Sequence, residues 1–468
     1  MNKPVRTSGP ASEAPPAFGL ATATFIVISS MVGTGVLTTS GFTVYFTGSN
    51  QLMLMLWVAG GVLAVCGAVS LCELAAALPR SGGDYIFLRE AYGPLIAFLS
   101  GWVSFLIGFG APIAASSSAA AHYLLAPAGL DEAPAALARP ALASAAIVAL
   151  TAVHCLGRRA TVLAQAGMTS VKLIVLIGLA AAGLAAGQGG WANLADRPPL
   201  TSDVFLGMAS SLIYISYAYT GWNAAAYIAG EVDRPQVVMP RAILAGTGLV
   251  LVIYLALNTA YALSISAGDI RAMVKESGNL DAVAPIAQIM AERLFGSQLA
   301  GPLSIALGLT LLASVSAYVL TGPRLACAMA RDGLFPAVAG RTSARGVPVI
   351  ATVLQSAWAI LLLWTASFER IVVFAGVGLA AFSLLSVAAV FVLRHTRPDL
   401  PRPFRTPGYP LIPAVYLVGT GLLTAAVIAQ RPLLAGVSLA SIAAGIPVYR
   451  IWAGWARPTH GTDPSQRG

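Results

Sequence analysis

The sequence alternates between long apolar runs and short polar loops. Each run approaches or exceeds the roughly 20 residues that a helix needs to cross a bilayer, and the runs are continuous rather than alternating as in barrel strands. The pattern therefore predicts an all-α polytopic membrane protein with twelve transmembrane helices. The predicted spans are 18–46, 52–77, 95–125, 140–157, 162–186, 203–229, 242–266, 299–328, 347–366, 370–393, 411–429 and 433–455.

Basic residues are unevenly divided between alternate loops. Of the 27 Lys and Arg residues, 19 lie in the N-terminal tail and in loops on its side of the predicted membrane, and 7 lie in the opposite loops. Because loops rich in Lys and Arg stay in the cytoplasm, we expect both termini there. The chain then consists of a disordered tail at 1–17, one transmembrane domain at 18–455 and a C-terminal tail at 456–468.

Composition agrees with a membrane protein and excludes several other classes. Hydrophobic residues make up 57% of the chain and charged residues 10%, whereas a soluble domain carries about 25% charged residues. The net charge of +9 is spread over short loops, which argues against a nucleic-acid surface. Abundant Ala and a strong excess of Arg over Lys indicate a GC-rich bacterial genome, and hence an inner (cytoplasmic) membrane. The four cysteines lack zinc-ligand spacing, and we expect no metal and no cofactor.

Two predicted spans are interrupted by glycine near their middle. The first contains Gly33-Thr34-Gly35, and the sixth contains Thr220-Gly221-Trp222-Asn223. Each glycine costs about 1 kcal/mol of helix propensity relative to alanine. Glycine alone favours close helix packing as the explanation. However, spans 1 and 6 open two five-span halves, and interrupted helices at matching positions of two halves indicate a transporter site.

Broken helices suit the two charges of an amino acid. The free N–H groups at a helix start favour a carboxylate, and the free carbonyls at a helix end favour an ammonium group. We therefore expect the first break to hold the carboxylate and the second the ammonium group. The candidate substrate-binding residues are Val32, Gly33, Thr34, Gly35, Tyr217, Ala218, Thr220, Gly221, Trp222 and Asn223.

Five motifs, in order along nearly the whole chain, resemble those of amino acid–polyamine–organocation (APC) superfamily permeases. They lie at residues 32–36; at 73–74 with 78–85; at 217–223 with 230–231 and 240–243; at 322–324 with 329–333; and at 402–410. The resemblance implies a LeuT-type fold, with inverted five-span repeats at 18–186 and 203–393 and two extra helices at 411–455.

The pair Trp222-Asn223 is similar to the L-type (LAT-like) branch of these amino acid transporters. Members of that branch can join a glycoprotein heavy chain through a cysteine in the outer loop between spans 3 and 4. Residues 126–139, which form this loop here, contain no cysteine, so no disulfide-linked heavy chain is implied.

Lys172 is predicted to lie deep inside span 5. A charge at such a depth costs at least about 3 kcal/mol, so the lysine is either a structural hydrogen-bond donor or a functional coupling residue. The resemblance implies that it replaces the sodium ion bracing helix 1 against helix 8 in sodium-dependent relatives, and it could also release a proton. Ser314 and Ser316 of span 8 are possible partners, and neither is favoured.

Three charged residues near the inner ends of spans are candidate gate residues: Glu73, Arg80 and Glu231. Glu73 could simply pair with an inner arginine such as Arg80 at the helix end, or it could close the inner side of the site. Glu231, directly after span 6, could pair across the same gate.

These features predict a sodium-independent transporter of amino acids that works by proton symport or amino acid exchange, with alternating access. The alternative is a polyamine or amino acid exporter of the same superfamily. Because Asp and Glu are absent from the middle of the spans, we expect a neutral zwitterion rather than a polyamine. A channel is disfavoured because its selectivity requires a symmetric pore. The sequence contains no catalytic triad or nucleotide-binding loop, so we expect no enzymatic activity.

Overall fold

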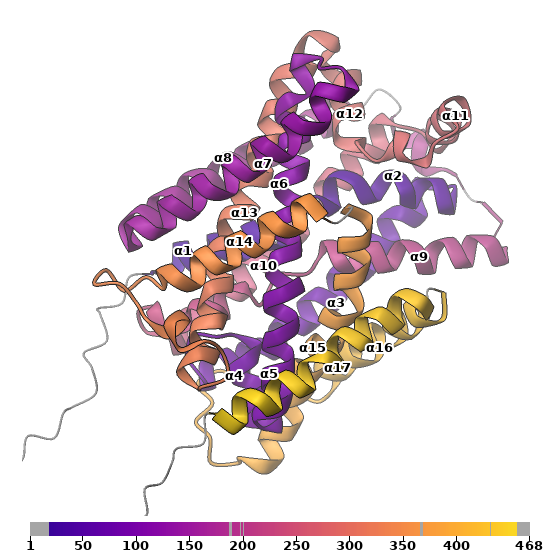
Figure 1. Cartoon of the computed structure of the whole chain (residues 1–468). Coiled ribbons are helices and arrows are strands. Elements are labelled where there is room, and N and C mark those ends of the chain that lie inside the picture. The colour runs from indigo at the N-terminus through magenta and orange to yellow at the C-terminus, as the bar shows by residue number, and fades with distance from the viewer. Residues whose placement is uncertain are drawn as a thin grey trace, which may run out of the picture.

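The computed structural model describes residues 18–186, 190–196, 198–199, 201–365, 368–430 and 432–455 (Figure 1). The tails predicted at 1–17 and 456–468 lie outside the described residues. In the described part of the chain, most of the backbone is helical, and β-type pairing is limited to one isolated bridge between Phe18 and Val232. This confirms the predicted all-α class, since helices satisfy their own backbone hydrogen bonds where a bilayer offers none.

The first half of the chain contains a broken first helix and a long third span with a π-helical segment, η1. π-Helical segments of this kind occur frequently at functional sites. The helices are α1 (Leu20–Met31), α2 (Gly35–Thr47), α3 (Asn50–Ala77), α4 (Asp84–Tyr92), α5 (Pro94–Val103), η1 (Ser104–Phe109), α6 (Gly110–Leu125), η2 (Ala126–Ala128), α7 (Glu132–Leu156), α8 (Arg158–Ala186) and η3 (Gly190–Leu194).

The second half opens with another broken helix, made of α9 and the 3-10 helix η4. Short helices between α10 and α13 form the long segment that the sequence places outside the membrane. The helices are α9 (Ser202–Ala218), η4 (Ala224–Glu231), α10 (Pro235–Ser264), α11 (Ala267–Ser277), η5 (Leu280–Val283), α12 (Ile286–Phe295), η6 (Ser297–Leu299), α13 (Ala300–Arg331), η7 (Ala337–Gly340), α14 (Val349–Thr365), α15 (Phe368–Thr396), α16 (Leu411–Gln430) and α17 (Pro432–Trp455).

Among the described residues, ten helical segments are long and apolar enough to cross a membrane. Two predicted spans are not among the ten. Span 9 corresponds to α14, an apolar helix of 17 residues, and span 6 is divided between α9, also of 17 residues, and η4. The polytopic architecture is thus confirmed, whereas the count of twelve stays a prediction.

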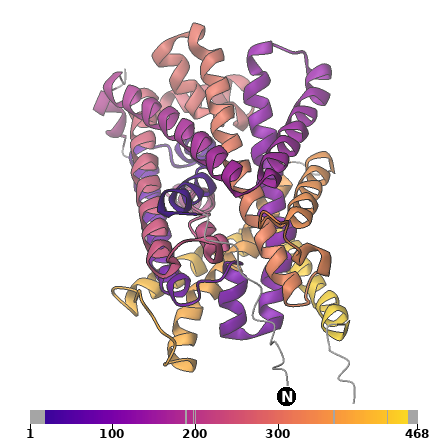
Figure 2. The ribbon, with the colours of Figure 1, turned by 90° about the vertical axis from the view of Figure 1, so that its left-hand side faces the viewer.

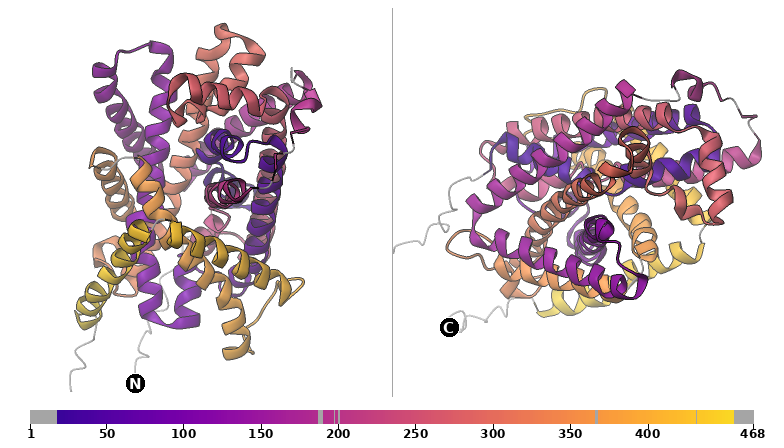
Figure 3. Two further views of the ribbon diagram at one scale, coloured as in Figure 1. Left: turned by 90° about the vertical axis from the view of Figure 1, so that its right-hand side faces the viewer. Right: turned by 90° about the horizontal axis from the view of Figure 1, so that it is seen from above.

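The broken first helix lies in the interior of the bundle. α1 packs against α8, α10 and α13, and Figure 2 shows it in indigo among helices from later in the chain. By contrast, α16 and α17 lie along one side, in yellow in Figure 3, where α16 packs on α3 and α15. The apolar window of α13 is 67% buried by protein and that of α16 only 11%, which leaves α16 facing lipid.

Candidate substrate site and inner gate

The first helix is interrupted within its glycine motif. α1 ends at Met31, α2 begins at Gly35, and residues 32–34 join them in a non-helical turn. Such a break leaves carbonyl groups at the end of α1 and N–H groups at the start of α2 without helical partners. A side chain added at Gly33 would meet no atom within 4 Å, because this residue borders open space.

The sixth predicted span is interrupted where α9 ends at Ala218, and helical structure resumes at Ala224. Gly221 in this turn has φ +104°, and a Cβ atom there would lie 2.7 Å from the Ser30 carbonyl oxygen. A Cβ atom at Gly35 would similarly lie 2.5 Å from that of Ala218. The two breaks cross in direct backbone contact, which only glycine permits at these positions.

A cavity of about 290 Å³ lies at this crossing, large enough for one amino acid. Nine of the ten candidate substrate-binding residues line it. Val32 is the exception, since its side chain is 2% exposed and lies behind the cavity wall. The nine lining residues are Gly33, Thr34, Gly35, Tyr217, Ala218, Thr220, Gly221, Trp222 and Asn223.

The Lys172 side chain connects the broken first helix to α13. Its ammonium group donates hydrogen bonds to the Val32 carbonyl at 2.6 Å, the Ser29 carbonyl at 3.2 Å and the Ser314 hydroxyl at 2.7 Å. These three acceptors match the three donors of an ammonium group. Lys172 is 0% exposed, whereas Ile174 on the same helix is 70% exposed, so α8 directs its lysine inward and its apolar face outward.

Ser316, the other serine considered for Lys172, makes different contacts. Its hydroxyl donates to Gln165 at 2.8 Å and lies 3.0 Å from the His154 ring. The Gln165 amide donates a hydrogen bond to the Thr169 hydroxyl. That hydroxyl also forms a 2.8 Å hydrogen bond with the hydroxyl of Ser29 in α1. The polar network therefore continues from α1 through α8 to α13 and α7, and no local pattern in the sequence indicates it.

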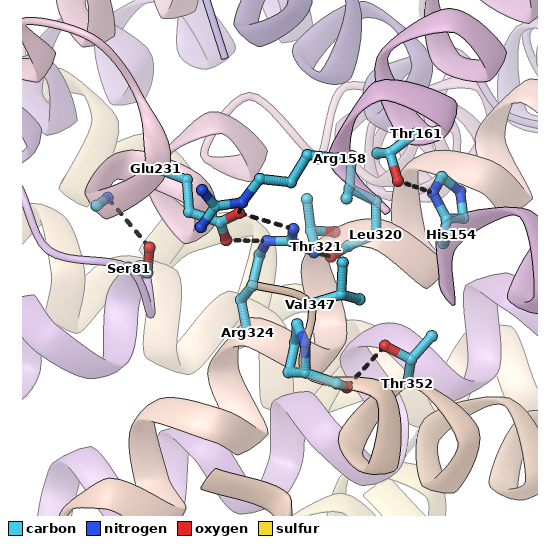
Figure 4. A network of polar contacts seen from close by, with 12 residues as sticks. Ser81, His154, Arg158, Thr161, Glu231, Leu320, Thr321, Arg324, Val347 and Thr352 are labelled. Carbon is cyan, nitrogen blue, oxygen red and sulfur yellow. Dashed lines mark hydrogen bonds and ion pairs between the residues drawn. The ribbon is translucent and has the colours of Figure 1, made fainter. Parts of the chain in front are cut away.

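Glu231 lies at the centre of an ion-pair cluster, which is shown in Figure 4. It accepts hydrogen bonds from Arg324 at 2.6 and 3.1 Å, and Arg158 lies 3.4 Å away. The three residues come from η4, α13 and the start of α8, so the cluster ties three predicted spans together. Arg324 and Glu231 are 5% and 12% exposed, which limits the screening of their charges.

Glu73 pairs with other arginines of the predicted inner loops and not with Arg80, the example considered above. Glu73 accepts hydrogen bonds from Nε of Arg394 at 2.8 Å and from Nη2 of the same residue at 2.6 Å, and Arg402 lies 3.3 Å away. Arg80 pairs with Glu90 at 2.6 Å. The reason is that α3 ends at Ala77, and the chain then turns toward α4, which carries Arg80 away from Glu73.

Asp84 also lines the cavity, although it lies outside every predicted span. It begins α4 directly after two glycines with positive φ, Gly82 and Gly83, which turn the chain back into the protein. Its carboxylate accepts from the Asn223 amide at 2.6 Å and from the Tyr227 hydroxyl at 3.4 Å. Burial raises the pKa of Asp84 to about 6. The glycine pair marks this turn in the sequence. A carboxylate thus lines the cavity from outside the spans, and the absence of Asp and Glu from the middle of the spans gave no sign of it.

Comparison with known proteins agrees with this architecture. The amino acid permease family model matches residues 18–448. The chain is 27% identical to human large neutral amino acids transporter small subunit 2, over 93% of this chain and 80% of that protein. It is 28% identical to mouse Asc-type amino acid transporter 1, over 93% and 81% of the two chains.

A third relative is the human cystine/glutamate transporter, which is 26% identical over 92% of this chain and 84% of its own. The relatives are amino acid transporters rather than enzymes, and the match to the family model spans nearly the whole chain. The chain is a multi-pass membrane protein that belongs to the amino acid permease family of the APC superfamily.

Proposed function

We propose that this protein carries amino acids across the cytoplasmic membrane without sodium, by alternating access to the cavity between the two broken helices. The start of α2 binds the substrate carboxylate, and the carbonyls around Tyr217, Ala218 and Thr220 bind its ammonium group. Both termini lie in the cytoplasm. Glu231 with Arg158 and Arg324, and Glu73 with Arg394, close the inner side.

The contact between Lys172 and the broken first helix is the observation that carries this proposal. The ammonium group lies 2.6 Å from the Val32 carbonyl and 2.7 Å from the Ser314 hydroxyl. It therefore supplies a fixed positive charge between the broken first helix and α13, where a bound cation would otherwise be needed. Transport is then coupled either to a proton or to an amino acid moving in the opposite direction.

The test uses purified protein in sodium-free liposomes and labelled neutral amino acids. Uptake that requires unlabelled amino acid inside establishes an exchanger, in which Lys172 is a fixed structural charge. Uptake into empty liposomes, driven by an inward proton gradient, establishes a symporter. Stimulation by sodium would contradict sodium independence, and failure of every amino acid in both assays would contradict amino acid transport.

A polyamine substrate remains the second candidate because of one observation, the Asp84 carboxylate in the cavity wall. A polyamine lacks the carboxylate that the start of α2 would bind, and it carries two or more cationic groups. Labelled putrescine in the same liposomes separates the candidates, since putrescine uptake without amino acid uptake would support the polyamine.

A further inference from the structure

The Asp84 carboxylate determines which way the Asn223 amide faces. Asp84 Oδ2 accepts a hydrogen bond of 2.6 Å from Asn223 Nδ2. An ionised carboxylate only accepts hydrogen bonds, whereas an amide has a donating and an accepting end. The amide nitrogen must therefore face Asp84, and Oδ1 must face away from it.

The accepting end of Asn223 is available to the cavity. Asn223 lines the cavity and is partly exposed, and no described residue donates a hydrogen bond to its Oδ1 atom. Phe109 and Tyr227 line the same cavity, with their rings in edge-on contact at 5.0 Å. These two rings contribute apolar surface to the cavity that Asn223 also lines.

The carboxylate itself is held by neutral groups. The Tyr227 hydroxyl of η4 donates to Asp84 Oδ2 at 3.4 Å, and the hydroxyl groups of Ser386 in α15 and Tyr416 in α16 lie near the carboxylate. No described arginine or lysine forms an ion pair with Asp84. Asp84 is therefore not committed to an ion pair of the inner gate.

We infer that Asp84 is a positioning residue, which orients Asn223 so that the cavity selects amino acids whose side chain donates a hydrogen bond, such as a hydroxyl amino acid. This inference rests on the proposed function and names the substrate class. A site that orients a buried acceptor discriminates against a substrate of the same shape that lacks the donor, because the acceptor then loses its hydrogen bond.

Threonine and valine provide the matched pair of substrates, since they have nearly the same shape and differ by a hydroxyl group. In liposomes containing the wild-type protein, we expect a KM for threonine at least about tenfold below that for valine. In the Asp84→Asn variant, the residue at 84 can offer either an oxygen or an NH2 group to Asn223. The ratio of the KM for valine to the KM for threonine then falls toward one.

The double variant Asp84→Asn/Asn223→Asp exchanges the two side chains. The carboxylate at 223 accepts from the amide at 84, and its second oxygen faces the cavity as an acceptor. The preference for threonine should therefore return in the double variant but not in Asn223→Asp alone, which places two carboxylates together. Glu276→Gln, which alters an exposed residue of α11, is the control for removal of a carboxylate and should leave the ratio unchanged.

Three outcomes would overturn the inference while leaving amino acid transport intact. They are equal wild-type KM values for threonine and valine, absence of threonine uptake by a protein that carries other amino acids, and an Asp84→Asn variant that slows both substrates at a constant ratio. The last result would make Asp84 purely structural. Absence of uptake for every amino acid would instead contradict the proposed function itself.

Discussion

The ammonium nitrogen of Lys172 lies 2.6 Å from the carbonyl oxygen of Val32, inside the break of the first helix. The two residues are 140 positions apart in the chain, and the lysine is 0% exposed. The same carbonyl accepts a hydrogen bond from Ser314 at 2.7 Å. The break is therefore held from behind by α8 and α13, while its other side lines the cavity.

Replacing this lysine should remove the hydrogen bonds that hold the broken first helix against α8 and α13. In Lys172→Met, an apolar side chain of similar length replaces the lysine, so the hydrogen bonds that the ammonium group donates are lost. Each hydrogen bond from a charged group contributes about 1.5–3 kcal/mol to stability. We expect counterflow uptake to fall at least about tenfold while the protein remains folded in detergent. Lys275→Met, on the exposed surface of α11, is the matched control. Full activity of Lys172→Met would show that the contact is dispensable.

Alanine should not be tolerated at Gly221, where the two breaks cross, but should be tolerated at a glycine away from the crossing. Gly221→Ala combines a positive φ with a contact at 2.7 Å, and we expect a loss of at least about 2 kcal/mol in stability and no transport. Gly167→Ala in α8 meets nothing within 4 Å and should be neutral or stabilising by up to about 1 kcal/mol. Thermal unfolding of both variants in detergent checks the difference.

Gly33→Ala tests the cavity rather than the fold. Its added methyl group would meet no protein atom within 4 Å, and Gly33 lines the cavity. We therefore expect unchanged thermal stability and a raised KM for the transported amino acid, because the methyl group occupies space meant for the substrate. An unchanged KM would argue that substrate does not bind at this break.

The Glu231–Arg324 pair should hold the inner side closed. Cys327, one turn beyond Arg324 on α13, is 5% exposed and donates to the Gly340 carbonyl. In a background that lacks the other three cysteines, Glu231→Gln should raise maleimide labelling of Cys327 by at least about tenfold. The reason is that removing one partner of a buried pair costs about 3–5 kcal/mol.

Glu90→Gln is the control for this labelling experiment. It removes the partner of Arg80, whose side chain is 52% exposed, and such exposed pairs contribute about 1 kcal/mol or less. Labelling of Cys327 should change little in this variant. An equal increase in both variants would show that labelling reports a general loosening and not the opening of a gate.

The selectivity between threonine and valine should depend on pH through Asp84. Burial raises the pKa of this carboxyl to about 6, so the charged form prevails above that pH and is lost as the pH falls through it. A protonated carboxyl can donate to Asn223 Oδ1, which releases the amide orientation. The ratio of the KM for valine to the KM for threonine, measured with the same pH inside and outside the liposomes, should be large at pH 7.5 and close to one at pH 5.

Among the residues that the structure describes, the ionisable groups that face Asp84 are the hydroxyls of Tyr227 and Tyr416, and a tyrosine ordinarily titrates near pH 10. Neither tyrosine accounts for a change between pH 5 and 7.5. In Asp84→Asn the ratio should consequently be independent of pH. A pH-dependent ratio in that variant would assign the effect to another group.

Local properties of the chain were sufficient to predict the class of the fold and the two breaks. Transfer into lipid and intrahelical hydrogen bonding depend on neighbouring residues, so long apolar runs indicate membrane helices wherever they pack. The cost of glycine in a helix is equally local, which is why Gly33, Gly35 and Gly221 marked the breaks. The depth of Lys172 within its span followed from the same pattern.

Long-range packing decided which side chains meet. Glu73 finds Arg394 at a separation of 321 positions rather than the nearby Arg80, and Asp84 reaches Asn223 across 139 positions. Val32 turns its carbonyl to Lys172 and its side chain away from the cavity. Such pairings depend on how the helices are rotated and placed against one another. The packing of many residues that are distant in the sequence sets this arrangement, so local sequence patterns do not predict it.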